Sequence, residues 1–140
     1  ALFWQIREDF EPEQKKFGRI FGYDVSLPLQ AMPAYVETAR EKLTSAFGDA
    51  ELIAYGHIGD GNLHFSIYPG AATERDAVDE IMYAPLQALR GSVSAEHGIG
   101  LEKKAYLKYT RSEAEVELMR KTKRMMDPAN ILNPGKLFDL

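Results

Sequence analysis

The chain has 140 residues with 45% hydrophobic and 11% aromatic content, values typical of one globular domain with a single core. Its net charge of −4 excludes the basic footprint of a nucleic-acid-binding protein, and no apolar run approaches the roughly 18 to 20 residues of a membrane span. The absence of cysteine excludes disulfides and thiolate metal sites.

The chain opens with an apolar cluster followed by charges, in residues 1–22, which predicts a helix end plus a connector. A start without an initiator methionine favours a segment of a longer protein, although a trimmed chain would look the same. The stretch YDVSLPL at 23–29 is rich in β-formers and closes on Pro28, which predicts an edge strand. From Pro33 onward apolar residues recur at helical spacing, with Gly48 as the expected C-terminal cap.

Two β-forming runs, AELIAYGHI and NLHFSIYPG, flank Asp60-Gly61, and this turn signal predicts a hairpin. The segment TERDAVDEIMYAPLQALRG at 73–91 predicts a second amphipathic helix, capped by Thr73. GSVSAE at 91–96 is typical of a fourth strand, and a third helix with a capping box is expected over 112–126.

The order β-α-β-β-α-β is the ferredoxin-like plan. It is an α+β fold in which both helices cover one face of a four-stranded antiparallel sheet. We therefore divide the chain into three parts: an opening helix and connector (1–22), a ferredoxin-like unit (23–100), and a C-terminal helix with an irregular tail (101–140).

The hairpin carries two of the three histidines. A turn at Asp60-Gly61 would place His57 directly opposite His64, with both side chains on one face of the sheet. The opposite face is apolar and suited to packing under the helices, so a one-residue slip is disfavoured. The histidine face would also carry Tyr55, Ser66 and Tyr68. The two imidazoles could converge on one ion, and a solvated or hydrogen-bonded pair without a ligand is the alternative.

The motif SVSAEHGIG supplies Glu96 and the third histidine, His97. If Glu96 projects to the helix-free face, two imidazoles and a carboxylate meet there. This donor set suits Zn²⁺ or another divalent first-row ion, with positions left open for a substrate oxygen. Gly98 and Gly100 permit a sharp turn, which would free His97 to act as an acid or base. The alternative makes Glu96 a surface charge and His97 a strand-end residue.

Three segments, GHIGDGNLH, SAEHGIGLEK and DPANILNPGK, resemble the C-terminal part of FAD-linked 2-hydroxy-acid dehydrogenases. This family of vanillyl-alcohol-oxidase-type flavoproteins includes D-lactate dehydrogenases, the glycolate oxidase FAD subunit and D-2-hydroxyglutarate dehydrogenase. The resemblance covers residues 4–138. It implies a substrate or cap domain that follows an N-terminal FAD-binding domain, with FAD as cofactor and a D-2-hydroxy acid as the small-molecule substrate oxidised to the 2-oxo acid.

The resemblance also implies a site face that looks toward the flavin. Without its FAD domain the chain would expose this face, so we expect it to self-associate as a homo-oligomer. For the parent enzyme the expected location is the cytoplasm, with peripheral attachment to a membrane left open.

Residue by residue, His57, His64 and Glu96 match metal ligands of the metal-dependent members, and Zn²⁺ or Mn²⁺ is the expected ion. His97 matches the base that takes the proton of the substrate hydroxyl. Asp60 and Asn62 are expected to shape the turn and not to touch substrate.

Substrate and cofactor contacts are implied elsewhere in the chain. Arg7 matches an arginine that receives the substrate carboxylate, and guanidinium can bind such a group through two hydrogen bonds. Ser66 stands at a substrate-facing position where asparagine can occur. Asn133 and Lys136 lie in the tail that returns to the FAD domain, where cofactor contact is implied and a plain turn is the alternative.

Two departures from the family pattern bear on the substrate. Members that bind a second carboxylate often carry a lysine just before YD and a hydroxyl residue four positions after the arginine, and this chain has Gly22 and Glu11 there. Together with Ser66, these differences argue against a dicarboxylate such as 2-hydroxyglutarate and favour a lactate- or glycolate-like substrate.

Two other functional classes stay open. A metal-dependent hydrolase could use the same ion to activate water, with His97 as the base. A non-catalytic ferredoxin-like module could instead use Tyr55 and Tyr68 as interface residues.

Overall fold

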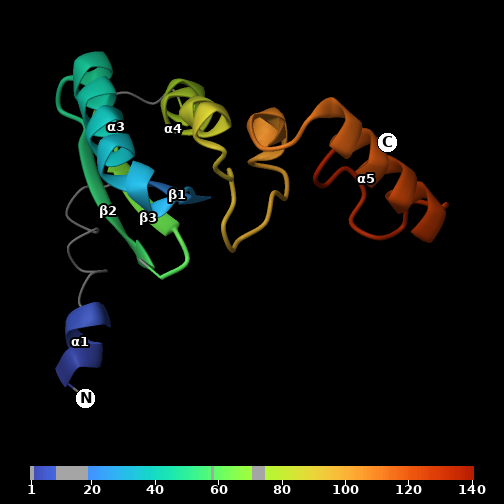
Figure 1. Cartoon of the computed structure of the whole chain (residues 1–140), viewed down its shortest axis with the longest axis horizontal. Coiled ribbons are helices and arrows are strands. Elements are labelled where there is room, and N and C mark those ends of the chain that lie inside the picture. Colours follow the sequence, from blue (N-terminus) through green and yellow to red (C-terminus); the bar gives the residue numbers. More distant parts are fainter. Residues whose placement is uncertain (1, 9–18, 58, 71–74) are drawn as a thin grey trace.

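The structure, a computed structural model, describes residues 2–8, 19–57, 59–70 and 75–140, and of residues 6–8 only the backbone. Its helices and strands in chain order are α1 (Leu2–Glu8), β1 (Phe21–Ser26), the 3₁₀ turn η2 (Leu29–Ala31), α3 (Met32–Phe47), β2 (Glu51–His57), β3 (Asn62–Tyr68), α4 (Arg75–Leu89), the 3₁₀ turn η3 (Lys104–Tyr109) and α5 (Glu113–Met126) (Figure 1). The predicted α+β class is confirmed.

The described strands form a three-stranded antiparallel sheet in the order β1-β3-β2. The prediction of a fourth strand at 91–96 is wrong, because this segment contributes only one antiparallel bridge, between Ser26 and Ser92. Three further backbone N–H groups of the segment, those of Val93, Ser94 and Glu96, donate to side chains. That of Val93 donates to Thr110 Oγ1, and those of Glu96 and His97 donate to the carboxylate of Asp24. A strand ladder cannot form where side chains take its donors.

The register of the hairpin differs from the prediction by two residues. His57 lies opposite Asn62, and Tyr55 lies opposite His64, because β2 ends at His57 and β3 begins at Asn62, so the connection is not centred on Asp60-Gly61. A shift of two preserves the side of the sheet, so His57 and His64 still share a face as diagonal neighbours. Gly61 closes the turn with φ +75°, and a Cβ there would lie 2.6 Å from the carbonyl oxygen of Leu27.

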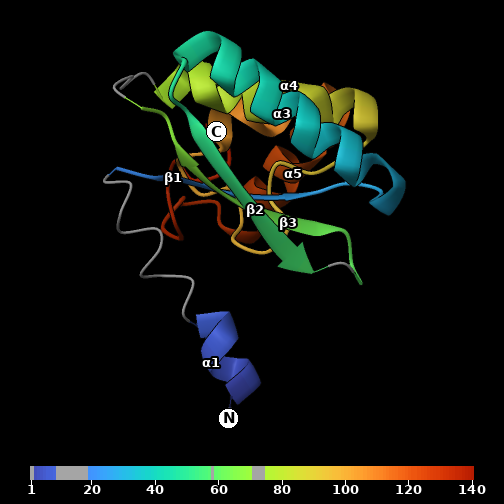
Figure 2. The same cartoon turned by 90° about the vertical axis from the view of Figure 1, so that its left-hand side faces the viewer.

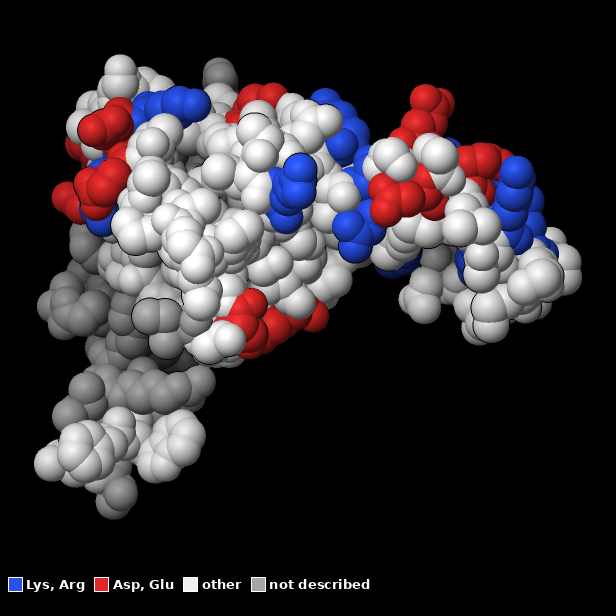
Figure 3. Space-filling view, viewed as in Figure 1, with Lys and Arg blue, Asp and Glu red and all other residues white. Residues whose placement is uncertain are grey.

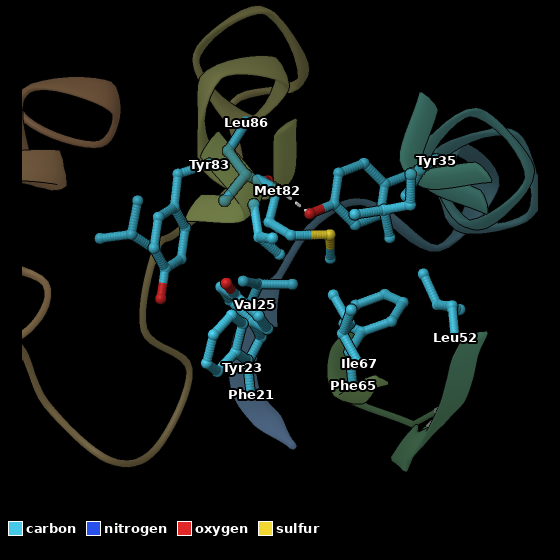
Figure 4. Close-up of a cluster of buried hydrophobic side chains, with 14 of the residues drawn as sticks. Phe21, Tyr23, Val25, Tyr35, Leu52, Phe65, Ile67, Met82, Tyr83 and Leu86 are labelled. Carbon is cyan, nitrogen blue, oxygen red and sulfur yellow. Dashed lines mark hydrogen bonds between the residues drawn. The ribbon is translucent and has the colours of Figure 1, made fainter. Parts of the chain in front are cut away.

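Helices α3 and α4 lie side by side over one face of the sheet, as predicted (Figure 2). Proline in its first turn starts α3, and Gly48 ends it with φ +70°. The expected cap of α4, Thr73, lies outside the described residues. Between helices and sheet lies the core drawn in Figure 4, whose labelled members are Phe21, Tyr23, Val25, Tyr35, Leu52, Phe65, Ile67, Met82, Tyr83 and Leu86.

The predicted third helix is confirmed as α5, whose N-terminus has the Ser112–Glu115 capping box. Acidic and basic side chains intermix over α5 in Figure 3. An irregular tail follows Asp127, as expected. None of the helices in the described ranges has the length and apolarity needed to cross a bilayer.

Candidate functional site

Ionisable side chains gather on the face of the sheet that the helices leave uncovered. Strand alternation turns Phe21, Tyr23 and Val25 of β1 into the core, so Asp24 points to the opposite side. His64 on β3 is the Cα partner of both Asp24 and Tyr55. The next row of the same face carries Ser26, Asn62 and His57.

His57, His64 and Glu96 come together at the β2–β3 end of this face. Nδ1 of His57 lies 3.1 Å from Oε1 of Glu96, and Nε2 of His64 lies 3.9 Å from the same oxygen. One nitrogen or oxygen from each of the three residues lies within 4.8 Å of the others. The side chain of His64 is 13% exposed, whereas those of His57 and Glu96 are 46% and 45% exposed. The sequence prediction grouped these three residues, and the structure brings them together.

This triad has the chemistry of a divalent metal site. Two imidazole nitrogens and one carboxylate oxygen form the donor set of many zinc enzymes. In a tetrahedral site with ligand distances of 2.0–2.2 Å, ligand atoms are about 3.3–3.6 Å apart. The separations of 3.1 and 3.9 Å bracket that value, so small side-chain rotations suffice to fit an ion.

His97 lies beside the triad and not within it. Its ring stacks on that of His64, with centroids 5.7 Å apart. Its Nδ1 lies 3.8 Å from Oδ2 of Asp24, and Nδ1 of His64 lies 3.9 Å from Oδ1 of the same carboxylate. Asp24, His64 and His97 thus form a second group with metal-ligand spacing. The carboxylate of Asp24 is already engaged, however, and this disfavours the second group as an ion site.

Asp24 is 1% exposed and is held by several donors. It accepts the backbone N–H groups of Glu96 and His97 and the hydroxyl of Ser94, and Lys103 Nζ lies 3.2 Å from Oδ2. Burial by itself raises the pKa of Asp24, but these hydrogen bonds and the charge of Lys103 together hold the pKa well below the usual carboxyl range. Burial lowers the pKa of Lys103, and Asp24 opposes that shift. The two side chains are placed as a buried salt bridge, with Nζ and Oδ2 3.2 Å apart.

Asn62 has a role beyond the expected shaping of the turn. Its backbone N–H donates to Asp60 Oδ1 at 3.1 Å, which is the turn contact. Its side chain is buried, and Nδ2 donates to Oε1 of Glu96, the oxygen that faces both histidines of the triad. Oδ1 of Asn62 has no hydrogen-bond partner among the described residues. Asn62 therefore orients the carboxylate of the triad.

Sequence reasoning did not single out Asp24 or Lys103. A signal for Asp24 existed, because an acidic residue between Tyr23 and Val25 in a strand must point away from the core. Lys103 had no comparable signal, since it reaches Asp24 from a turn 79 positions later in the chain.

The remaining predicted site residues lie farther from the triad. Ser66 is buried on the same face, one row away, opposite Gly22. Arg7 belongs to α1, and its side chain lies outside the described residues, as does all of Glu11. Asn133 and Lys136 are exposed and joined by a 3.3 Å backbone hydrogen bond. The C-terminal tail to which they belong runs beside α5, apart from the β2–β3 hairpin (Figure 1). They line a groove of about 490 Å³ against α5.

Comparison with known proteins defines the family. The family model described as FAD linked oxidases, C-terminal domain, matches residues 1–137, and the chain belongs to this family. It is 41% identical over 146 residues to D-2-hydroxyglutarate dehydrogenase from Xanthomonas citri pv. viticola, an alignment covering 99% of this chain and 31% of that protein.

Two further relatives carry related names. Identity is 36% with D-2-hydroxyglutarate dehydrogenase of Stutzerimonas stutzeri, covering 96% of this chain and 30% of that protein. It is 38% with the mitochondrial D-2-hydroxyglutarate dehydrogenase of Rattus norvegicus, covering 96% of this chain and 25% of the relative. The chain therefore spans less than a third of the length of these relatives.

Proposed function

We propose that this domain is the substrate-binding part of an FAD-dependent oxidoreductase that oxidises a D-2-hydroxy acid to the 2-oxo acid. The observation that carries the proposal is the convergence of His57, His64 and Glu96 on the open face of the sheet, in a chain of the FAD-linked oxidase family. In this proposal the three residues hold a divalent ion, Zn²⁺ or Mn²⁺. A bound ion supplies Lewis-acid chemistry, which lowers the pKa of a coordinated hydroxyl and orients it.

Each residue that the sequence assigns to the site then has a proposed task. His97 would accept the proton of the substrate hydroxyl at a ring nitrogen. FAD, when bound, would supply the redox chemistry by accepting the hydride of the same carbon. Loss of one proton and one hydride converts the hydroxy acid to the oxo acid. Arg7 binds the substrate carboxylate, Ser66 contacts the substrate, and Asn133 with Lys136 contacts the cofactor.

The exposure of the site face supports the presence of a second domain that covers it. The side chains of His57 and Glu96 are nearly half exposed, so the triad is accessible from outside the domain. A hydride transfer site must exclude water. We therefore propose that an FAD domain of the same parent protein covers this face.

The side chain of the substrate is proposed to be small and uncharged, as in lactate or glycolate. Gly22 and Ser66 are paired on the site face, one row from His64, and neither supplies a cation. The second candidate is D-2-hydroxyglutarate, which the names of the relatives favour.

The test uses the complete parent protein under anaerobic conditions. D-lactate, glycolate and D-2-hydroxyglutarate are added in turn, and bleaching of the flavin is followed before and after metal removal. Bleaching that chelation abolishes and Zn²⁺ or Mn²⁺ restores is the expected result. Bleaching that survives chelation would keep the dehydrogenase and return the two histidines of the hairpin to hydrogen-bonding roles. If no hydroxy acid bleaches the flavin, the hydrolase alternative takes its place.

A variant sharpens the choice of substrate. Gly22→Lys adds a cation where a Cβ meets no atom within 4 Å, so the backbone should tolerate it. A hydrogen bond to a charged group contributes about 1.5–3 kcal/mol, so kcat/KM for D-2-hydroxyglutarate relative to D-lactate should rise about tenfold or more. An unchanged ratio would place the substrate side chain away from Gly22.

A further inference from the structure

Asp24 lies beneath the segment that carries Glu96 and His97. Oδ2 accepts the backbone N–H of His97 at 2.9 Å, and both carboxylate oxygens lie 3.1 Å from the backbone nitrogen of Glu96. Hydrogen bonds to a buried, ionised carboxylate are short and about twice as strong as neutral ones. The two peptide units that carry the candidate ligand and the candidate base are thus attached to one side chain of β1.

Lys103 completes the arrangement from the other side. Its Nζ lies 3.2 Å from both Oδ2 and the backbone oxygen of Asp24, and 3.0 Å from Oγ of Ser94. Oγ of Ser94 in turn lies 3.0 Å from Asp24 Oδ2. Asp24 and Lys103 are both buried, so each neutralises a charge that would otherwise be expensive to bury. The pair cannot move without exposing or separating its charges.

A purely structural aspartate offers the contrast within the same domain. Asp79 on α4 is also buried, but its carboxylate accepts the hydroxyl of Tyr23 and faces Arg75 at 3.4 Å, and neither of these partners belongs to the triad. Asp24 instead contacts the backbone of Glu96 and His97 and lies 3.9 Å from His64 Nδ1. The carboxylate of Asp24 therefore lies within 4 Å of His64, Glu96 and His97.

We propose that Asp24, held in place by Lys103, is the positioning residue that fixes Glu96 in reach of the two hairpin histidines and His97 beside them. Asp24 itself binds neither ion nor substrate. Its role as a support for metal binding rests on the proposed function. Its role in ordering the 92–98 segment does not.

The first test compares two matched variants of the complete parent protein. Asp24→Asn keeps the shape of the side chain but removes its charge, and Asp79→Asn makes the same change on the other face. Metal-free samples are titrated calorimetrically with Zn²⁺ and with Mn²⁺. Loss of a group that orients a ligand typically weakens metal binding by about 10- to 100-fold, which is expected for Asp24→Asn. Asp79→Asn should bind the ion as the wild type does, and equal weakening in both variants would overturn the proposal.

A double variant distinguishes two causes of weaker metal binding in Asp24→Asn. One is the loss of the carboxylate that positions Glu96 and His97, and the other is the unpaired charge of Lys103. Asp24→Asn combined with Lys103→Met removes both members of the buried ion pair, so no unpaired lysine remains. Metal affinity should stay low in this protein. Full recovery would show that the unpaired Lys103, and not the lost carboxylate, caused the effect, and would overturn the proposal.

Amide hydrogen exchange gives a readout that does not depend on an ion. Peptides covering residues 92–98 should exchange faster in Asp24→Asn than in Asp79→Asn, because the N–H groups of Glu96 and His97 lose their charged acceptor. If the wild type binds no metal, the metal assignment fails and exchange alone decides the positioning role. Equal exchange in the two variants would overturn it.

If Asp24→Asn does not fold, Ser94→Ala replaces it. This variant removes a hydroxyl that bridges Asp24 and Lys103 without leaving a charge unpaired. The same readouts should change in the same direction by a smaller factor. Unchanged affinity and unchanged exchange would contradict the proposal.

Discussion

The two faces of the sheet differ in what they bury. The face under α3 and α4 buries aromatic and aliphatic side chains, and its polar groups are few and paired, as Tyr23 is with Asp79. The open face collects three histidines, Glu96, and the Asp24–Lys103 ion pair. Because side chains alternate along a strand, neighbours in sequence such as His64 and Phe65 belong to different faces. We therefore expect single substitutions in β3 to change either the free energy of unfolding or the proposed metal affinity, depending on the face to which the residue belongs.

The largest effect is expected on the covered face. Phe65→Ala deletes a ring that is 1% exposed, and such deletions cost about 3–5 kcal/mol of unfolding free energy. Urea unfolding of the chain, followed by circular dichroism, measures the loss. Metal affinity of the folded variant should be unchanged, and a large drop in affinity would show that the two faces are not independent.

Its neighbour should behave in the opposite way. His64→Gln removes a proposed ligand, so metal affinity should fall by more than about a hundredfold, which exceeds the loss expected when a residue that only orients a ligand is changed. The unfolding free energy of the metal-free protein should change by about 1 kcal/mol or less.

The control for this experiment is His97→Gln, which alters a histidine of the same face that the proposal keeps out of the ligand set. It should abolish turnover and leave metal affinity near wild type. A comparable loss of affinity would favour Asp24, His64 and His97 as the ion site.

A smaller loss of unfolding free energy is expected at Tyr23, which donates a hydrogen bond to the buried carboxylate of Asp79. Tyr23→Phe removes the hydroxyl that donates to Asp79, and losing a hydrogen bond to a charged group costs about 1.5–3 kcal/mol. Tyr35→Phe, which removes a hydroxyl that donates to the neutral carbonyl of Met82, is the matched control and should cost only about 0.5–1.5 kcal/mol. Equal costs would mean that the charge of Asp79 is satisfied without Tyr23.

The smallest effect concerns a region outside both faces. Asp127 ends α5, and its carboxylate accepts the side chain of Lys123 and the backbone N–H groups of Ile131 and Leu132. The Lys123 hydrogen bond, followed by these two N–H groups, lowers the pKa of Asp127 to about 2. Because the folded pKa lies below the usual value of 3.8, this contribution to tail order is present above pH 4 and is lost as the pH falls toward 2.

Amide NMR signals of Ile131 and Leu132 should shift over that interval in the wild type. They should not shift in Asp127→Asn, which has no carboxyl to titrate. A shift that persists in Asp127→Asn would assign the titration to another group.

Most of the fold could be predicted from the alternation of apolar and polar residues in strands and from the helical spacing of apolar residues. Apolar residues at every second position indicated which side of the hairpin faces the helices. This prediction stayed correct although the predicted register was wrong by two residues, because an even shift does not exchange the two faces. The triad could be grouped from sequence for the same reason, since an even shift leaves His57 and His64 together. Capping signals at Gly48 and Ser112 located two helix ends.

What the sequence left hidden depends on side chains that meet from distant segments. The 91–96 segment has the composition of a strand, yet the backbone N–H groups of Val93 and Glu96 donate to the side chains of Thr110 and Asp24. Such competition between side chains and a backbone ladder has no local signature. Lys103 and the carboxylate contact of Asn62 were missed for the same reason.

The attachment of residues 94–97 to β1 also bears on how the domain assembles. His57 and His64 belong to one hairpin, which can pair locally, whereas Glu96 reaches Asn62 across 34 positions and Asp24 across 72. Contacts of such separation carry the larger loop-closure cost. The three proposed ligands His57, His64 and Glu96 therefore come together only after the segment that follows α4 has docked against β1. An ion held by all three residues would bind the finished domain far better than the isolated hairpin, and so would draw the folding equilibrium toward the docked segment.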